Sequence, residues 1–74
     1  MTRLPRISGT QCVRALCRAA FEVRRREGSH VTLRRDGPFA QVVVPLHKEL
    51  DRGTLKAILR HANLSVEEFR LLLK

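Results

Sequence analysis

The amino-acid sequence predicts a two-layer α+β sandwich in which helices pack on one face of a three-stranded antiparallel sheet. Three patterns predict it: an early apolar stripe with helical spacing, period-two alternation in the middle, and two further helical stripes at the end. Helices that precede and follow three such strands bury their stripes against one sheet face. The 74 residues suffice for one such unit, so we expect a single domain over residues 1–74.

The first helix is predicted to begin after Ser8. Ser8 and Gln11 fit a capping box, in which each residue's side chain accepts a hydrogen bond from the other's backbone. Two cysteines, Cys12 and Cys17, lie five residues apart in the apolar stripe that follows. That spacing matches neither a CxxC nor a zinc-ligand pattern, so we expect buried thiols in a reducing compartment.

The spacing changes to period two at Phe21, which predicts a first strand over residues 21–26. Its polar face is expected to hold three charged side chains: Glu22, Arg24 and Arg26. A tight connection at Glu27-Gly28-Ser29 leads into a second strand, and a third strand covers residues 39–44 and ends at Pro45.

The second strand separates apolar from polar side chains. Val31 and Leu33 are apolar, so they are expected to face the helices. Successive side chains of a strand point to opposite faces. The open face therefore receives the alternating polar set: His30, Thr32 and Arg34.

Two helical segments close the chain. The stripe formed by Leu55, Ile58, Leu59 and Ala62 predicts the first, with Asp51, Gly53 or Thr54 in its cap and Asn63 as a left-handed terminator. Ser65 and Glu68 form a second capping box, which predicts a last helix over residues 66–73.

The charge balance indicates a polyanionic partner. Fifteen Lys and Arg residues against seven Asp and Glu give a formal net charge of +8. Nucleic acid is the first candidate, followed by an acidic protein and an anionic membrane surface. The apolar runs are too short to span a bilayer and the N-terminus lacks a signal-peptide pattern, so we expect a cytoplasmic protein.

Arginines cluster on the first two predicted strands, where guanidinium groups can bind phosphate bidentately. A solvated polar edge that protects the sheet from aggregation is the alternative. The chain has no Tyr or Trp, so base stacking is expected to be minor and backbone contacts to dominate. The residues expected to contact RNA are Arg24, Arg26, Ser29, Thr32 and Arg34.

His30 is the strongest candidate for a catalytic residue. An imidazole titrates near neutral pH, so it can take a proton from a ribose 2′-hydroxyl or give one to a leaving oxygen. A structural or simply exposed histidine is the alternative. His47 is a candidate second acid/base group or phosphate contact, or a surface-loop histidine, whereas His61 suits a helix end. The residue pattern predicts no metal site and no cofactor.

Four segments occur in an order and spacing that span nearly the whole chain, from Ile7 to Leu73. They are Gly28-Ser29-His30-Val31, Val43-Val44-Pro45-Leu46-His47, residues 53–59 (GTLKAIL) and residues 63–69 (NLSVEEF). Together they resemble the HicA-type (YcfA-like) mRNA interferase toxins. The chain departs from the usual pattern at Ala20 and Asn63, where that family commonly has glycine.

The resemblance implies a fold similar to that of a double-stranded-RNA-binding domain. It also implies a type II toxin that cleaves mRNA, with the catalytic histidine at the position of His30. Such cleavage needs no bound metal, because the nucleophile is a hydroxyl of the RNA itself. The implied partner is an acidic HicB-type antitoxin, bound in a hetero-oligomer. A non-catalytic RNA-binding module is the alternative function.

Overall fold

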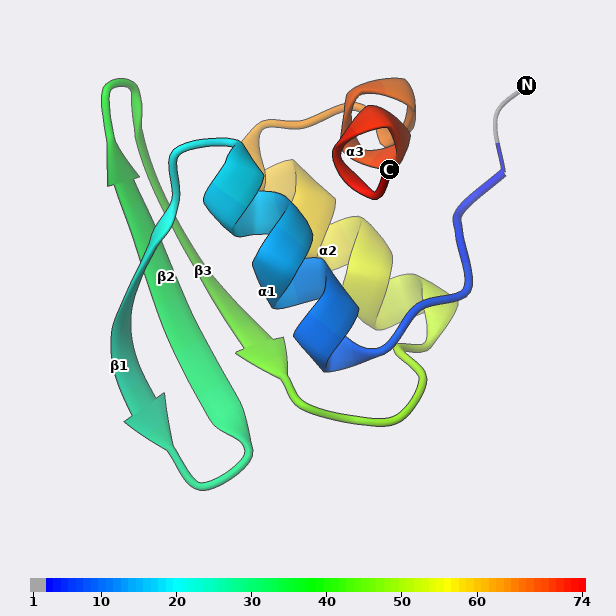
Figure 1. Ribbon diagram of the computed structural model, residues 1–74, viewed down its shortest axis with the longest axis horizontal. Helices are drawn as coiled ribbons and strands as arrows, with labels where there is room; N and C mark the ends of the chain where they lie inside the picture. Colours follow the sequence, from blue (N-terminus) through cyan, green and yellow to red (C-terminus); the bar gives the residue numbers. More distant parts are fainter. Residues whose placement is uncertain (1–2) are drawn as a thin grey trace.

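The computed structural model describes residues 3–74 and has the expected α+β architecture, with elements in the order α-β-β-β-α-α. The helices and the sheet form two layers (Figure 1). This architecture is consistent with a fold like that of a double-stranded-RNA-binding domain. The elements are α1 (Gly9–Arg18), β1 (Glu22–Glu27), β2 (His30–Asp36), β3 (Phe39–Pro45), α2 (Arg52–Ala62) and α3 (Val66–Leu72).

The three strands form an antiparallel sheet in the order β1-β2-β3, and helices α1 and α2 cover one of its faces (Figure 1). Val31 and Leu33 of β2 are buried there, beside their β3 partners Val44 and Val42. The core thus occupies the space between the layers, and the predicted division of β2 into a buried and an open face is confirmed. Helix α3 packs against α1, away from the sheet.

Local hydrogen bonds fix the helix ends as the sequence predicts. Both capping boxes are formed, by Ser8 with Gln11 and by Ser65 with Glu68. Asp51 caps α2 by accepting a hydrogen bond from the Thr54 backbone N–H at 2.7 Å. Asn63 ends α2 in the left-handed conformation, and Ala20 also has a positive φ, of 70°, between α1 and β1.

The expectation that both cysteines are buried is correct for Cys12 and wrong for Cys17. Burial raises the pKa of the Cys12 thiol to about 12. Cys17 is exposed, because five helical positions rotate the side chain by roughly 140°, away from the face that packs on the core.

Strand β1 departs from strict alternation. Its register against β2 shifts between Val23 and Arg25, where one additional β1 residue enters the ladder. Arg25 consequently pairs with Thr32 on the open face, and Arg26 pairs with the buried Val31 on the helix side. Alternation counted from Phe21 predicts the opposite direction for both arginines.

A close backbone approach joins the start of α1 to the end of β3. A Cβ added at Gly9 would lie 2.7 Å from the Leu46 Cα and nearer still to the Pro45 carbonyl oxygen. The Gly9 N–H donates to the His47 carbonyl at 2.9 Å, and the Leu50 N–H donates to the Ile7 carbonyl at 2.8 Å. Only a residue without a side chain allows this contact.

Replacing Gly9 with alanine is expected to lower the free energy of unfolding by about 1–3 kcal/mol, because the new methyl group overlaps backbone atoms that cannot rotate away. Urea denaturation followed by circular dichroism measures the change. Gly53→Ala is the matched control, since its Cβ would meet only the Asp51 carboxylate at an ordinary 3.7 Å. Equal stability of the two variants would contradict the packing argument.

Candidate nucleic-acid interface

His30 is exposed at the first position of β2, on the sheet face that no helix covers. The antiparallel ladder places it between Glu27 of β1 and Pro45 of β3. Side chains of directly paired residues point to the same face, with Cβ atoms roughly 5 Å apart. A solvent-accessible imidazole in this position can exchange protons with a bound substrate.

The two-residue turn at Gly28-Ser29 positions this imidazole. Gly28 has a positive φ of 57°, which glycine adopts without steric cost in a hairpin turn of this length. The Ser29 carbonyl accepts a hydrogen bond from the Leu46 N–H at 2.6 Å, so the turn is tied to the chain that leaves β3. Ser29 itself is exposed beside His30.

His47 lies two residues beyond Pro45, at the same end of the sheet as His30, and is exposed. Its carbonyl accepts the Gly9 hydrogen bond, which holds the backbone here while the side chain stays in solvent. Hydrogen bonds from Thr54 lower the pKa of Asp51, and the charge of His47 contributes a smaller lowering. The His47 imidazole is therefore close enough to the α2 N-terminus to act on its capping carboxylate.

The β-bulge decides which arginines share the face of His30. Thr32 and Arg34 of β2 are on this face, and β1 contributes Arg25 there. Arg26 lies on the helix side, where its Nε donates to the Gly28 carbonyl at 3.5 Å. The structure thus brings Arg26 near the turn but not onto the surface that carries His30.

Sequence reasoning missed Arg25 and Glu27 as neighbours of the imidazole. Glu27 could have been found, because a two-residue hairpin turn pairs the residues that flank it, here Glu27 and His30. Arg25 could not have been found from the sequence, since only the register shift turns its side chain toward the open face.

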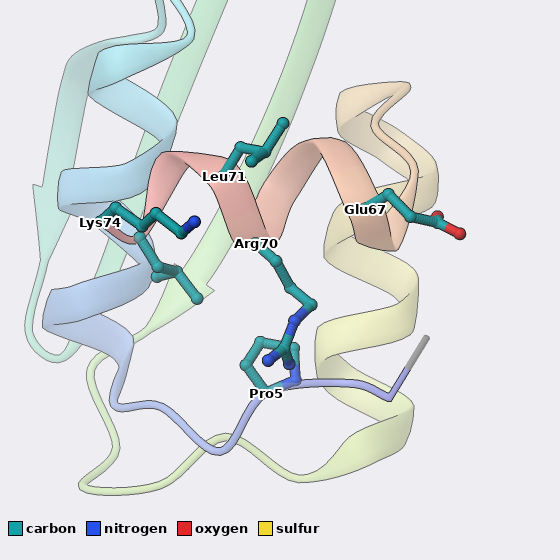
Figure 2. A pocket seen from close by; sticks show the side chains of 6 residues that line it. Pro5, Glu67, Arg70, Leu71 and Lys74 are labelled. Carbon is teal, nitrogen blue, oxygen red and sulfur yellow. The ribbon is translucent and has the colours of Figure 1, made fainter. Parts of the chain in front are cut away.

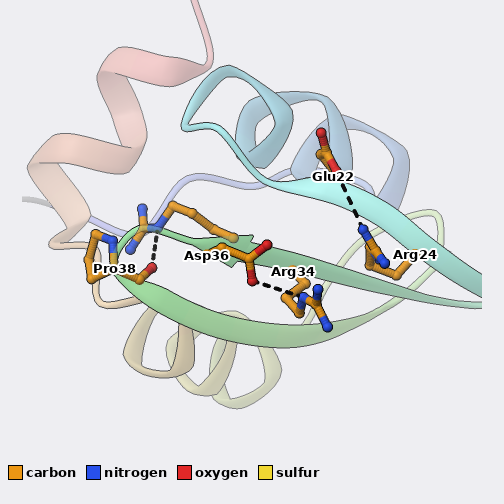
Figure 3. A network of polar contacts seen from close by, with 6 residues as sticks. Glu22, Arg24, Arg34, Asp36 and Pro38 are labelled. Carbon is orange, nitrogen blue, oxygen red and sulfur yellow. Dashed lines mark hydrogen bonds and ion pairs between the residues drawn. The ribbon is translucent and has the colours of Figure 1, made fainter.

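Each of three arginines in β1 and β2 forms an ion pair with a carboxylate two residues away in its own strand. Figure 3 draws two of the three pairs, Arg24–Glu22 and Arg34–Asp36. In the same strand the Arg35 Nε donates to the Pro38 carbonyl at 3.1 Å. The pairs are Arg24–Glu22 (3.6 Å), Arg25–Glu27 (3.0 Å) and Arg34–Asp36 (3.1 Å). The Arg24 and Arg25 pairs are solvent-exposed, so each contributes little to stability and a phosphate can replace the carboxylate. In the third pair Asp36 is exposed, whereas Arg34 is half-buried and its Nε is shielded from solvent.

Helix α2 carries positive charge that no carboxylate within it balances. Arg52, Lys56 and Arg60 recur every four residues on the exposed side of α2, and none has an ion-pair partner within residues 3–74. Arg35 is not available to a ligand. Its guanidinium packs 4.7 Å from the centre of the Phe21 ring and donates to the Ala62 carbonyl at 3.2 Å.

The helix side carries a separate hollow between α3 and the N-terminal segment, in which the Arg70 side chain bends toward Pro5 (Figure 2). None of the predicted site residues lines it. Across residues 3–74 no three His, Cys, Asp or Glu side chains gather in a way that could hold a metal ion. No helix within the same range is long and apolar enough to cross a membrane.

Fold and site together define a small, strongly basic two-layer α+β protein with an exposed histidine on its open sheet face. The model of the family "HicA toxin of bacterial toxin-antitoxin" matches residues 9–64. The chain belongs to the HicA toxin family, so it is the toxin of a toxin-antitoxin pair. No curated protein matches it.

Acid is expected to destabilise the protein partly through Asp51. Thr54 favours the ionised carboxylate in the folded state and so lowers its pKa, which makes this stabilisation complete above the carboxyl's ordinary pKa. It is lost as the pH falls through the lowered folded value. Asp51→Asn keeps a capping side chain but removes this titration, so its midpoint of thermal unfolding should fall less between neutral pH and about pH 3.

Glu49→Gln is the matched control for the Asp51 variant. Glu49 is an exposed carboxylate in the same loop, and it makes no hydrogen bond or ion pair within residues 3–74. It should keep the pH dependence of the parent protein, and an equal flattening in both variants would contradict the capping argument.

Proposed function

We propose that this chain is an endoribonuclease that cleaves mRNA and thereby stops translation, with His30 as its general acid or base. The observation that carries the proposal is the exposure of the His30 imidazole on the uncovered sheet face, beside a turn of fixed geometry. Membership of the HicA toxin family supports an mRNA-cleaving activity.

The proposed reaction uses a nucleophile that the RNA itself provides. A ribose 2′-hydroxyl loses its proton and attacks the adjacent phosphorus, which leaves a 2′,3′-cyclic phosphate. The bond to the 5′-oxygen of the next nucleotide breaks, and that oxygen takes up a proton. An imidazole at His30 can accept the first proton or supply the second, so one side chain serves one of the two transfers.

A second group is needed for the other proton. His47 is the proposed partner or a phosphate contact, because its exposed imidazole follows the strand residue that pairs with His30. Negative charge that builds on the phosphate needs cations close by. Arg24, Arg34 and the outward-facing Arg25 are proposed to supply it, with Ser29 and Thr32 as further RNA contacts. Arg26 faces the helix side and is less well placed for this role.

The second partner we propose is an acidic antitoxin of the HicB type, bound in a hetero-oligomer. A net charge of +8 on so small a body favours association with an anionic protein surface. An antitoxin that covers the open sheet face would exclude RNA from His30.

His30→Ala is expected to lower the rate of RNA cleavage by about 100-fold or more, because it removes a positioned acid or base. The measurement is single-turnover cleavage of a labelled mRNA. His61→Ala is the control, since His61 is an exposed imidazole on α2. Salt-sensitive RNA binding by the wild type without any cleavage would favour the non-catalytic binding module instead.

Cleavage is expected to persist in excess EDTA, because an internal 2′-hydroxyl attack assisted by side chains requires no bound metal. The same labelled mRNA is incubated with chelator and then with added Mg²⁺. A rate that falls with EDTA and returns with Mg²⁺ would remove the metal-independent mechanism while leaving the nuclease assignment in place.

A further inference from the structure

We infer that Phe39 is a stacking platform for a base of single-stranded RNA that lies along the open sheet face, several nucleotides from the bond held at His30. The inference rests on the proposed function and adds two things to it. It names single-stranded RNA as the substrate class, and it gives the bound strand a second fixed point.

Phe39 is the aromatic side chain that the core does not use. The chain has three phenylalanines and no Tyr or Trp. Phe21 and Phe69 are 2% and 0% exposed, whereas Phe39 is 63% exposed. It begins β3 next to the buried Ala40, so its ring belongs to the open face, which it shares with Val43.

The strand register gives the distance between Phe39 and the candidate catalytic residue. His30 pairs with Pro45 and Asp36 pairs with Phe39, so six residues of β3 separate the two positions. At the rise of a β-strand this is about 20 Å. An extended RNA strand covers such a length with about three or four nucleotides, within the range of small single-strand-binding domains.

Arg34 lies between the two ends of this path. Its Nε faces the Asp36 carboxylate at 3.1 Å, and its terminal nitrogens have no hydrogen bond or ion pair within residues 3–74 (Figure 3). Those nitrogens can bind a phosphate while the ion pair with Asp36 stays in place. The face therefore offers an imidazole, a free guanidinium edge and an aromatic ring in a row.

This combination favours RNA over a protein ligand, and a single strand over a duplex. An aromatic face stacks with any unpaired base, and a neighbouring cation holds the adjacent phosphate. In a duplex the bases are already stacked inside the helix and their faces are not accessible to a side chain. A net charge of +8 attracts the strand irrespective of sequence.

The first test measures binding alone, in the His30→Ala background, with a labelled twelve-nucleotide single-stranded RNA. Adding Phe39→Ala should raise the dissociation constant by about 5- to 150-fold, the range expected when one stacked base is lost. Phe39→Trp should retain tight binding and Phe39→Leu should not. Val43→Ala is the matched control, because Val43 is 49% exposed on the same strand and face but has no ring.

The second test uses cleavage to locate the stacked base. With the wild-type cut site mapped, RNAs are shortened from either end, or carry one abasic nucleotide at each position in turn. Phe39→Ala should lower kcat/KM only for RNAs that extend about three or four nucleotides beyond the cut on one side. An abasic nucleotide at that position should slow the wild type to the rate of Phe39→Ala and have no further effect on the variant.

The outcomes separate this inference from the proposed function. If His30→Ala abolishes cleavage and Phe39→Ala binds and cuts every RNA like the wild type, the stacking platform is wrong and the nuclease stands. If the wild type never cuts RNA but Phe39→Ala weakens single-strand binding, the nuclease assignment is wrong and the stacking platform stands. Binding that is equally sensitive to Phe39 for duplex RNA, or a defect confined to antitoxin binding, also overturns the inference.

Discussion

The close contact between Gly9 and the backbone of Pro45 and Leu46 is the constraint on which the site depends. It brings the first residue of α1 against the end of β3, and the hydrogen bond from Leu46 to Ser29 extends the connection to the turn before His30. Three segments far apart in the sequence therefore meet at one end of the sheet. A small domain has little core with which to fix an exposed side chain, and backbone hydrogen bonds at this end provide the rigidity instead.

The register of β1 has the next largest consequence, because it assigns each arginine to a face. One extra residue in the ladder turns Arg25 toward His30 and Arg26 toward the helices. Strand β1 is at the sheet edge and exposed along its whole length, so burial does not enforce a regular register there. Strand β2 is central, and the burial of Val31 and Leu33 fixes its register.

Features that depend on local contacts could be predicted from the sequence, and features that depend on distant contacts could not. Element order, both capping boxes, the left-handed Asn63 and the outward His30 follow from residues within one or two helical turns of each other, and all are confirmed. The bulge in β1 and the fit at Gly9 depend on contacts with distant segments. Spacing along the chain contains no information about them. The exposure of Cys17 was predictable from helix geometry, since Cys12 already occupies the buried face.

The charges that attract a polyanion over a long range are not the groups that would position it on the open sheet face. In strands β1 and β2 three arginines are paired with three carboxylates, whereas the unpaired cations of α2 lie in the opposite layer. Long-range attraction of a polyanion therefore arises from the whole molecule and weakens with salt.

A phosphate that binds on the open face must exchange with, or share, an existing ion pair, so the net binding free energy it gains there is small. Specific placement on this face then depends on groups that have no partner to give up, namely the terminal nitrogens of Arg34, the His30 imidazole and the Phe39 ring.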